Sequence, residues 1–112
     1  MNNRNCQDSG PFGRGGEHPV AVMMAFYGML GPAFVEFAIA RANRLSLTGW
    51  IREEGNRVLT HIEGPEALIG AFEMACCLGP LEVDVQDWDS TEVVADPNLS
   101  GFDIRHSVSG KV

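Results

Sequence analysis

The amino-acid sequence predicts one small α+β domain in which two helices cover one face of a mostly antiparallel sheet. The chain has 112 residues, 45% of them hydrophobic, which suits a single domain with its own core. Apolar segments with strand or helix periodicity follow one another in the order strand, helix, strand, strand, helix, strand. Glycine and proline separate most of these segments, as expected for turns.

The first half of the predicted domain contains a strand, a helix and a hairpin. Residues 20–27 are apolar without interruption, which is typical of a central strand covered on both faces. Pro32 fits the first turn of a helix, and apolar residues at helical spacing extend it to about Arg44. Residues 47–53 and 57–62 flank a Glu-Gly-Asn turn signal and predict two hairpin strands.

The second half is predicted to supply a helix and two strands. Gly64 as N-cap and Pro65 at the first position open the helix, and Gly79 ends it. Apolar residues alternate over 81–85 and predict the fourth strand, and residues 101–106 predict a last short one. The βαββαβ order is that of a ferredoxin-like fold with both helices on one face of the sheet.

Order is expected to begin at Pro19. Residues 1–18 are rich in Asn and Gly and offer little apolar area, so we predict a flexible N-terminal arm. Residues 19–107 are predicted to form the domain and residues 108–112 a C-terminal tail.

Composition excludes several classes of partner. The formal charge of −7 and the pI of about 4.7 argue against nucleic-acid binding, which needs clustered Lys and Arg. The odd cysteine count, with Cys6 in the arm and Cys76 beside Cys77 in a helix, predicts reduced thiols and a cytoplasmic protein.

No apolar segment has the length of a signal peptide core or a membrane span, so no membrane contact is expected.

No pattern of a metal site or a nucleophile is present in the sequence. The three histidines, His18, His61 and His106, share no ligand spacing, and the aspartates at 84, 87 and 89 are interpreted as a solvated strand edge. The glycines near residues 28–31 are not followed by the Lys-Ser/Thr of a phosphate-binding loop.

The sheet face without helices is expected to be open to a ligand, a protein partner or a second copy. Trp50 and Trp88 could each belong to a binding surface, and for Trp50 packing under a helix or a dimer contact competes with ligand stacking. A self-dimer across this face is therefore one hypothesis, and a protein partner is the other.

Leu47-Thr48-Gly49 on one hairpin strand and Glu63-Gly64-Pro65 after the other resemble the BLUF family of flavin-binding blue-light sensors. The resemblance spans most of residues 20–106 and also implies a ferredoxin-like fold. It implies a signalling domain with an FAD site.

The resemblance places five flavin-site positions at Phe26, Asn43, Thr60, Phe102 and Ile104. The photoactive tyrosine of the family falls at Phe26, which cannot donate a proton, and the flavin-binding glutamine falls at Thr60, which has no amide. The site is thus degenerate, and we expect no blue-light photochemistry. No bound cofactor is expected, and FAD is the candidate if a cofactor binds.

Residues 42–52, with Leu-Thr-Gly-Trp-Ile-Arg at 47–52, resemble acylphosphatase, which shares the fold. That family needs an arginine after the first strand to hold phosphate and an asparagine to position water. These positions fall at Val35 and Glu53, and an anion site with valine for arginine and glutamate for asparagine would repel its substrate, so acylphosphatase activity is not expected.

These observations lead to a BLUF-like sensory, regulatory or interaction domain that is not an enzyme, with a protein partner or self-dimer and no metal. Two alternatives remain: a diverged acylphosphatase-like small hydrolase, and an FAD-binding blue-light photoreceptor with an altered site.

Overall fold

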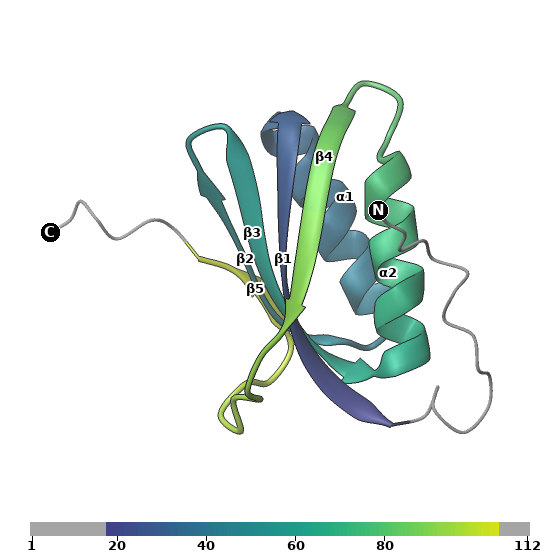
Figure 1. Ribbon diagram of the computed structural model, residues 1–112, viewed down its shortest axis with the longest axis vertical. Helices are drawn as coiled ribbons and strands as arrows, with labels where there is room; N and C mark the ends of the chain where they lie inside the picture. Colours follow the sequence, from purple (N-terminus) through teal and green to yellow (C-terminus); the bar gives the residue numbers. More distant parts are fainter. Residues whose placement is uncertain (1–17, 106–112) are drawn as a thin grey trace, which may run out of the picture.

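The computed structural model describes residues 18–105, and its elements follow the predicted order (Figure 1). The predicted flexible arm, apart from His18, and the predicted tail lie outside the described residues. The elements are β1 Pro19–Met29, α1 Gly31–Arg44, β2 Thr48–Glu54, β3 Arg57–Pro65, α2 Glu66–Leu78, β4 Asp84–Glu92 and β5 Phe102–Ile104.

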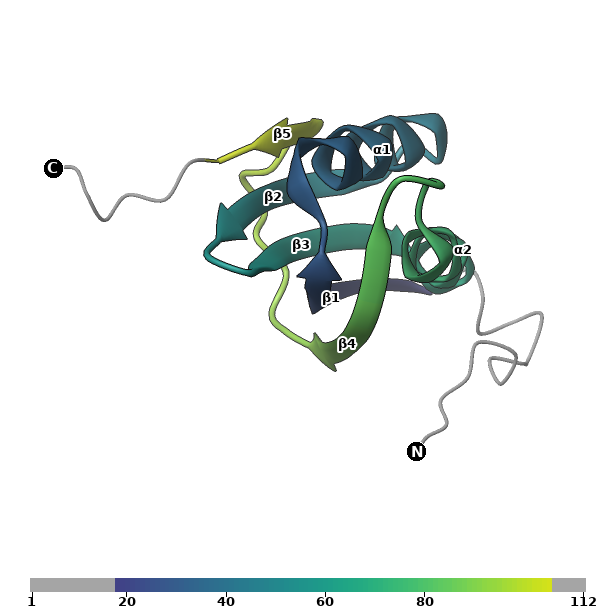
Figure 2. The ribbon, with the colours of Figure 1, turned by 90° about the horizontal axis from the view of Figure 1, so that it is seen from above.

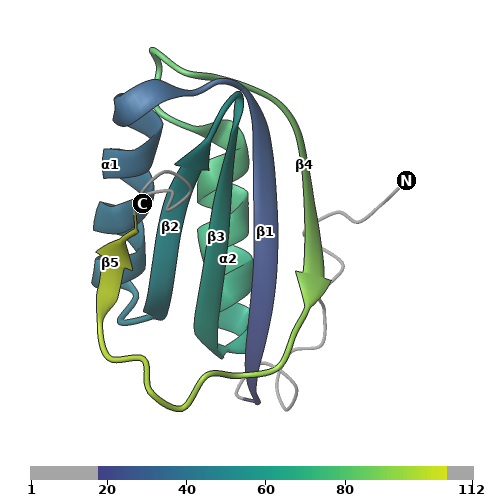
Figure 3. The same cartoon turned by 90° about the vertical axis from the view of Figure 1, so that its left-hand side faces the viewer.

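The strands form one five-stranded sheet in the order β4-β1-β3-β2-β5 (Figure 3). β1 runs antiparallel to β3 and β4, β2 runs antiparallel to β3, and only β5 lies parallel to its neighbour β2. This confirms the predicted ferredoxin-like α+β fold with a mostly antiparallel sheet.

Both helices lie on one face of the sheet (Figure 2). α1 contacts β2 and β5, and α2 contacts β3 and β1. Because strand side chains alternate in direction, each strand gives every second residue to this helix-covered face. The opposite face carries no helix and is called the open face below.

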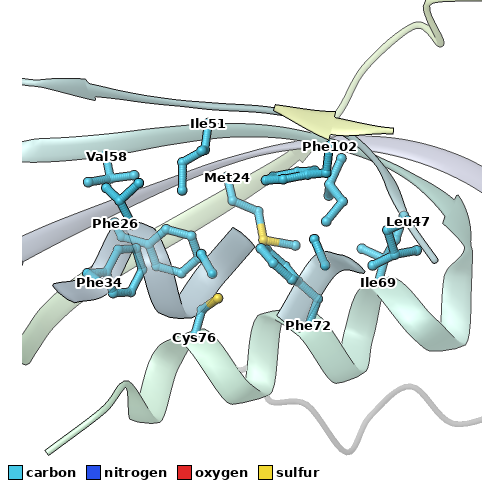
Figure 4. Packing of buried hydrophobic residues seen from close by; sticks show 14 of the residues in the cluster. Met24, Phe26, Phe34, Leu47, Ile51, Val58, Ile69, Phe72, Cys76 and Phe102 are labelled. Carbon is cyan, nitrogen blue, oxygen red and sulfur yellow. The ribbon is translucent and has the colours of Figure 1, made fainter. Parts of the chain in front are cut away.

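The core fills the space between the helices and the helix-covered face. Met24 and Phe26 of β1, Phe34 of α1 and Phe72 of α2 are fully buried, and they point toward one another in Figure 4. The rings of Phe26 and Phe34 lie 5.1 Å apart, centroid to centroid. This packing fixes the start of α1 against the end of β1.

Two glycines set how closely the chain approaches itself around the hairpin strands β2 and β3. Gly49 has φ 147°, and a Cβ there would collide with the carbonyl oxygen of His61 on the neighbouring strand. Gly64 has φ 156°, and a Cβ there would collide with the Leu47 side chain. Both positions therefore require glycine for reasons of the fold.

The fourth strand differs from its prediction. It covers Asp84–Glu92, so the apolar residues Leu81 and Val83 precede it in a turn, and Leu81 is fully exposed. The apolar alternation at 81–85 does not mark the strand, because β4 lies at the edge of the sheet, where water can hydrate polar side chains.

The second helix begins one residue later than predicted, with Pro65 as N-cap, because β3 continues through Pro65. In residues 18–105 no helix is long and apolar enough to cross a membrane.

Candidate active site

The connection between β1 and α1 leaves the first backbone N–H groups of the helix without a side-chain cap. Only Leu30 separates the two elements, and it makes no side-chain cap. Pro32 lies in the first turn, and that turn holds no acidic residue. The first N–H groups of α1 thus have no side-chain partner there and lie at the positive end of the helix dipole. Such a helix start can accept the oxygens of a phosphate.

The structure places the two positions marked by the acylphosphatase resemblance near this end of the sheet. Val35 follows the first turn of α1, is 5% exposed and belongs to the core. Glu53 lies near the end of β2, at which α1 begins (Figure 3), and its side chain is exposed. It lies two residues beyond buried Ile51, on the helix-covered face. Neither position supplies a cation or an amide.

Cations do occur at this end of the sheet, but on the open face. Arg52 and Arg57 both bind the carboxylate of Glu54, with N–O distances of 2.7 and 2.9 Å. The hydrogen bond from Arg57 is the main cause that lowers the pKa of Glu54 below its usual value. Because Arg52 alternates with Ile51 along β2, its side chain points away from α1. Arg52 and Arg57 therefore do not substitute for the missing arginine.

A cavity of about 550 Å³ lies at the other end of the sheet, where β1 begins and β4 ends. Two carboxylates, Glu63 and Glu92, line it, so it is unfavourable for a phosphate. Its other lining residues are Pro19, Val20, Ala21, Ser46, Thr48, Gly64, Val93 and Ala95. The first turn of α1 remains the better anion site.

The five positions assigned to flavin do not gather in one cavity. Phe26, Thr60 and Phe102 are buried in the core, where Phe102 packs on Phe72 and the Thr60 hydroxyl has no hydrogen-bond partner. Asn43 is exposed on α1, and Ile104 is 45% exposed on β5. None of the five lines the cavity described above.

The two tryptophans are held by neighbours within the chain. Trp50, on the open face, stacks on His61 at 5.8 Å and lies under the guanidinium groups of Arg52 and Arg105 at 5.0 and 5.2 Å. Trp88 donates a hydrogen bond to Glu73 of α2. Trp88 thus packs under a helix, whereas Trp50 remains part of the open face.

The other polar groups named from the sequence take structural positions. His61 is hydrogen-bonded to Glu63 at 2.7 Å, His18 is exposed, and His106 lies outside the described residues. Among residues 18–105 no three His, Cys, Asp or Glu side chains are grouped as a metal site would need. Burial raises the pKa of the Cys76 thiol well above its usual value, which makes it a poor nucleophile.

The backbone of the first turn of α1 is the feature that sequence reasoning missed. Its signals were present, since Gly31 and Pro32 mark an abrupt helix start directly after a strand. The Lys-Ser/Thr of a phosphate-binding loop does not follow them, so that motif gives no signal here. Backbone N–H groups can bind an anion without those side chains.

Comparison with known proteins identifies the relatives of this chain. The acylphosphatase family model matches residues 31–104. Acylphosphatases of Nocardioides sp. and Anaeromyxobacter dehalogenans are each 33% identical over 76 residues, which is 67% of this chain and 76% and 82% of theirs. An acylphosphatase structure from Coxiella burnetii has a TM-score of 0.74 at 21% identity, covering 84% of this chain and 100% of that one.

The interpretation of the chain as a BLUF-like sensory domain is wrong. The BLUF protein BlrB reaches a TM-score of 0.57 at 20% identity, over 81% of this chain and 74% of its own, which shows a shared fold alone. The FAD, blue-light sensing and signalling that the BLUF resemblance implied conflict with the family match. The flavin assignment of the five positions loses its basis with it.

The prediction that the chain is not an enzyme is also wrong, because the matched family and relatives are acylphosphatases. That prediction relied on Val35 and Glu53, two substituted positions that do not decide the family. The diverged acylphosphatase-like hydrolase, first kept as an alternative, is the better supported interpretation.

Proposed function

Because the chain belongs to the acylphosphatase family, we propose that it hydrolyses acyl phosphates and holds the phosphate group at the first turn of α1. The observation that carries this proposal is the family match over residues 31–104, which begins at the first residue of α1 and includes β2. The uncapped N–H groups at that helix start support the placement of the anion.

In this reaction the bonds that form and break belong to water and the substrate, and the protein needs to supply little covalent chemistry. Water attacks phosphorus, the bond from phosphorus to the acyl oxygen breaks, and a carboxylate and inorganic phosphate leave. Catalysis of phosphoryl transfer is mostly positioning and charge stabilisation. The backbone N–H groups of Gly31 and Ala33, which have no partner within the helix, would bind phosphate oxygens as charge shifts toward the leaving carboxylate.

The two substituted positions make this site a weak one. Val35 provides no guanidinium to match the phosphate charge, and Glu53 adds a negative charge near the same end of the sheet. Glu53 can accept a hydrogen bond from the attacking water, but it also repels the substrate. We expect slow turnover with a high KM.

The primary test measures hydrolysis of benzoyl phosphate and acetyl phosphate by the purified chain against their loss in buffer. A protein-dependent rate that inorganic phosphate inhibits supports the proposal. A rate equal to that in buffer for both substrates overturns it.

Two variants locate the site. Glu53→Asn removes the repelling charge and should raise kcat/KM about tenfold, whereas Glu92→Asn, an equal change on exposed β4 at the other end of the sheet, should leave it unchanged. Val35→Arg with Glu53→Asn should raise kcat/KM roughly 100-fold, because one charge-stabilising donor is worth that much. Since Val35 is buried, circular dichroism and urea unfolding must show that this double variant folds.

We also propose that the protein acts in the cytoplasm and without a cofactor. Cys76 is a buried thiol of α2, and neighbouring residues of a helix do not face each other, so a Cys76–Cys77 disulfide is not expected, which agrees with a reducing compartment. Treatment with a chelator should leave hydrolysis unchanged, and a loss of activity would contradict this part.

A further inference from the structure

The open face offers a surface that the proposed hydrolysis does not use. It lies on the side of the sheet away from α1 and faces the viewer in Figure 3, with β4 and β2 on either side of β1 and β3. Its side chains form cross-strand rows, because the strand registers align one residue from each of the four strands. The order of residues within these rows indicates which partner fits.

The central row has opposite charges at its two ends and apolar residues between them. It runs from Asp89 on β4 through Ala25 and Leu59 to Arg52 on β2. A two-fold axis parallel to the strands, above the gap between β1 and β3, would place β4 of one copy over β2 of the other. Asp89 of each copy then meets Arg52 of the other, and Ala25 meets Leu59. The row is self-complementary, as an isologous interface requires.

The row toward the start of β1 is also compatible with this axis. It contains Thr91, Met23, His61 and Trp50. The same rotation brings Met23 of one copy over His61 of the other, where the stacked Trp50 covers most of the ring and leaves His61 only 7% exposed, so this pair adds little. Trp50 is held in place by its stack on His61, so little side-chain freedom would be lost on association.

The row toward the end of β1 contains Asp87, Tyr27, Arg57 and Glu54. Tyr27 would meet Arg57, a favourable pairing of a cation with an aromatic ring. Asp87 would meet Glu54, and the two carboxylates repel each other; Arg57 pairs with Glu54, whereas Arg52 is shared between Glu54 and Asp89 of the other copy. This row adds no net attraction, so the central row determines the register.

We propose that a second copy of this chain docks on the open face through this two-fold arrangement. Four strands about 4.8 Å apart and about seven residues long give a face of roughly 450 Å² in projection. A contact of that size is at the small end of specific interfaces, so the dimer should be weak, with a Kd of roughly tens of micromolar.

The test is sedimentation equilibrium of the full chain from about 1 to 500 µM, a range that brackets the expected Kd. A monomer–dimer equilibrium is expected, and Leu59→Asp should raise the Kd at least tenfold by placing a charge at the centre. Leu81→Asp is the matched control, because Leu81 is equally apolar but fully exposed in the turn before β4. A monomer throughout, or a dimer that Leu59→Asp leaves unchanged, overturns the proposal.

A charge swap tests the register independently. Asp89→Arg should weaken the dimer about tenfold, because it would face Arg52 of the other copy. Asp89→Arg combined with Arg52→Asp should return the Kd to within about threefold of the starting value. If the double variant is as weak as the single one while both unfold like the original chain, the arrangement is wrong.

Discussion

On the helix-covered face of the sheet Met24, Phe26 and Ile51 are fully buried, whereas their neighbours on the open face, such as Met23 and Arg52, are only partly covered. The same strands supply both sets, since side chains alternate along a strand. The buried residues of the first face are apolar except for Thr60, and the second face mixes aromatic, charged and aliphatic groups. The comparison suggests that the fold depends on one face and leaves the other free for association.

The largest expected difference between the faces is in stability. Phe26→Ala should lower the free energy of unfolding by about 3–5 kcal/mol, because it empties a fully buried site next to Phe34. Leu59→Ala on the open face should cost less than about 1 kcal/mol. Urea unfolding at low protein concentration measures both, and equal losses would remove the distinction between the faces.

A smaller effect is expected at Trp50, the largest side chain of the open face. Trp50→Ala should cost about 1–2 kcal/mol, because it removes the stack on His61 and the guanidinium contacts of Arg52 and Arg105. Urea unfolding gives the value, with Trp50→Phe as the control that retains a ring. A loss as large as that of Phe26→Ala would mean that Trp50 belongs to the structural core.

Thr60 is the exception on the helix-covered face, and its replacement should have the opposite sign. Its hydroxyl is fully buried without a hydrogen-bond partner. Thr60→Val keeps the shape and removes the unsatisfied group, so it should stabilise the protein by about 1 kcal/mol. The same unfolding measurement checks it, and destabilisation would indicate that the hydroxyl has a partner in solution.

The smallest effect concerns the ion pairs of the open face. The hydrogen bond from Arg57 lowers the pKa of Glu54 from 4.5, so its charged form is stabilised in the folded state. That stability is present above the unfolded pKa and is lost as the pH falls through the folded one. In Glu54→Gln the free energy of unfolding should therefore decrease slightly less steeply as the pH falls below 4.5. An unchanged slope would show that this carboxylate contributes nothing.

Much of the fold could be predicted from the sequence because its signals are local. The apolar run at residues 20–27, the Pro32 helix start and the Glu-Gly-Asn turn each determine their own element. The strand at Asp84–Glu92 could not be found this way, since its place depends on pairing with β1 and its sequence is polar. Tertiary context overrides propensity at such an edge.

The family was harder to predict, and two glycines explain why. The Thr-Gly and Glu-Gly-Pro motifs that suggested BLUF contain Gly49 and Gly64, which the backbone requires in this hairpin whatever the function. Motifs of this kind indicate a shared fold rather than a shared activity. The site was missed for a related reason, because the first turn of α1 would bind an anion through its backbone, which leaves few side-chain signals.

The strand order also limits how this sheet can grow. One border is β5, only three residues long, and the other is β4, which exposes Asp84, Asp87 and Asp89. Short or charged border strands discourage further strands from adding on, which protects a protein from fibre formation. Copies can then contact one another through the sheet only by its faces, and the helices already cover one of the two. If copies associate through the open face as proposed, assembly therefore stops at two copies and does not extend into a filament.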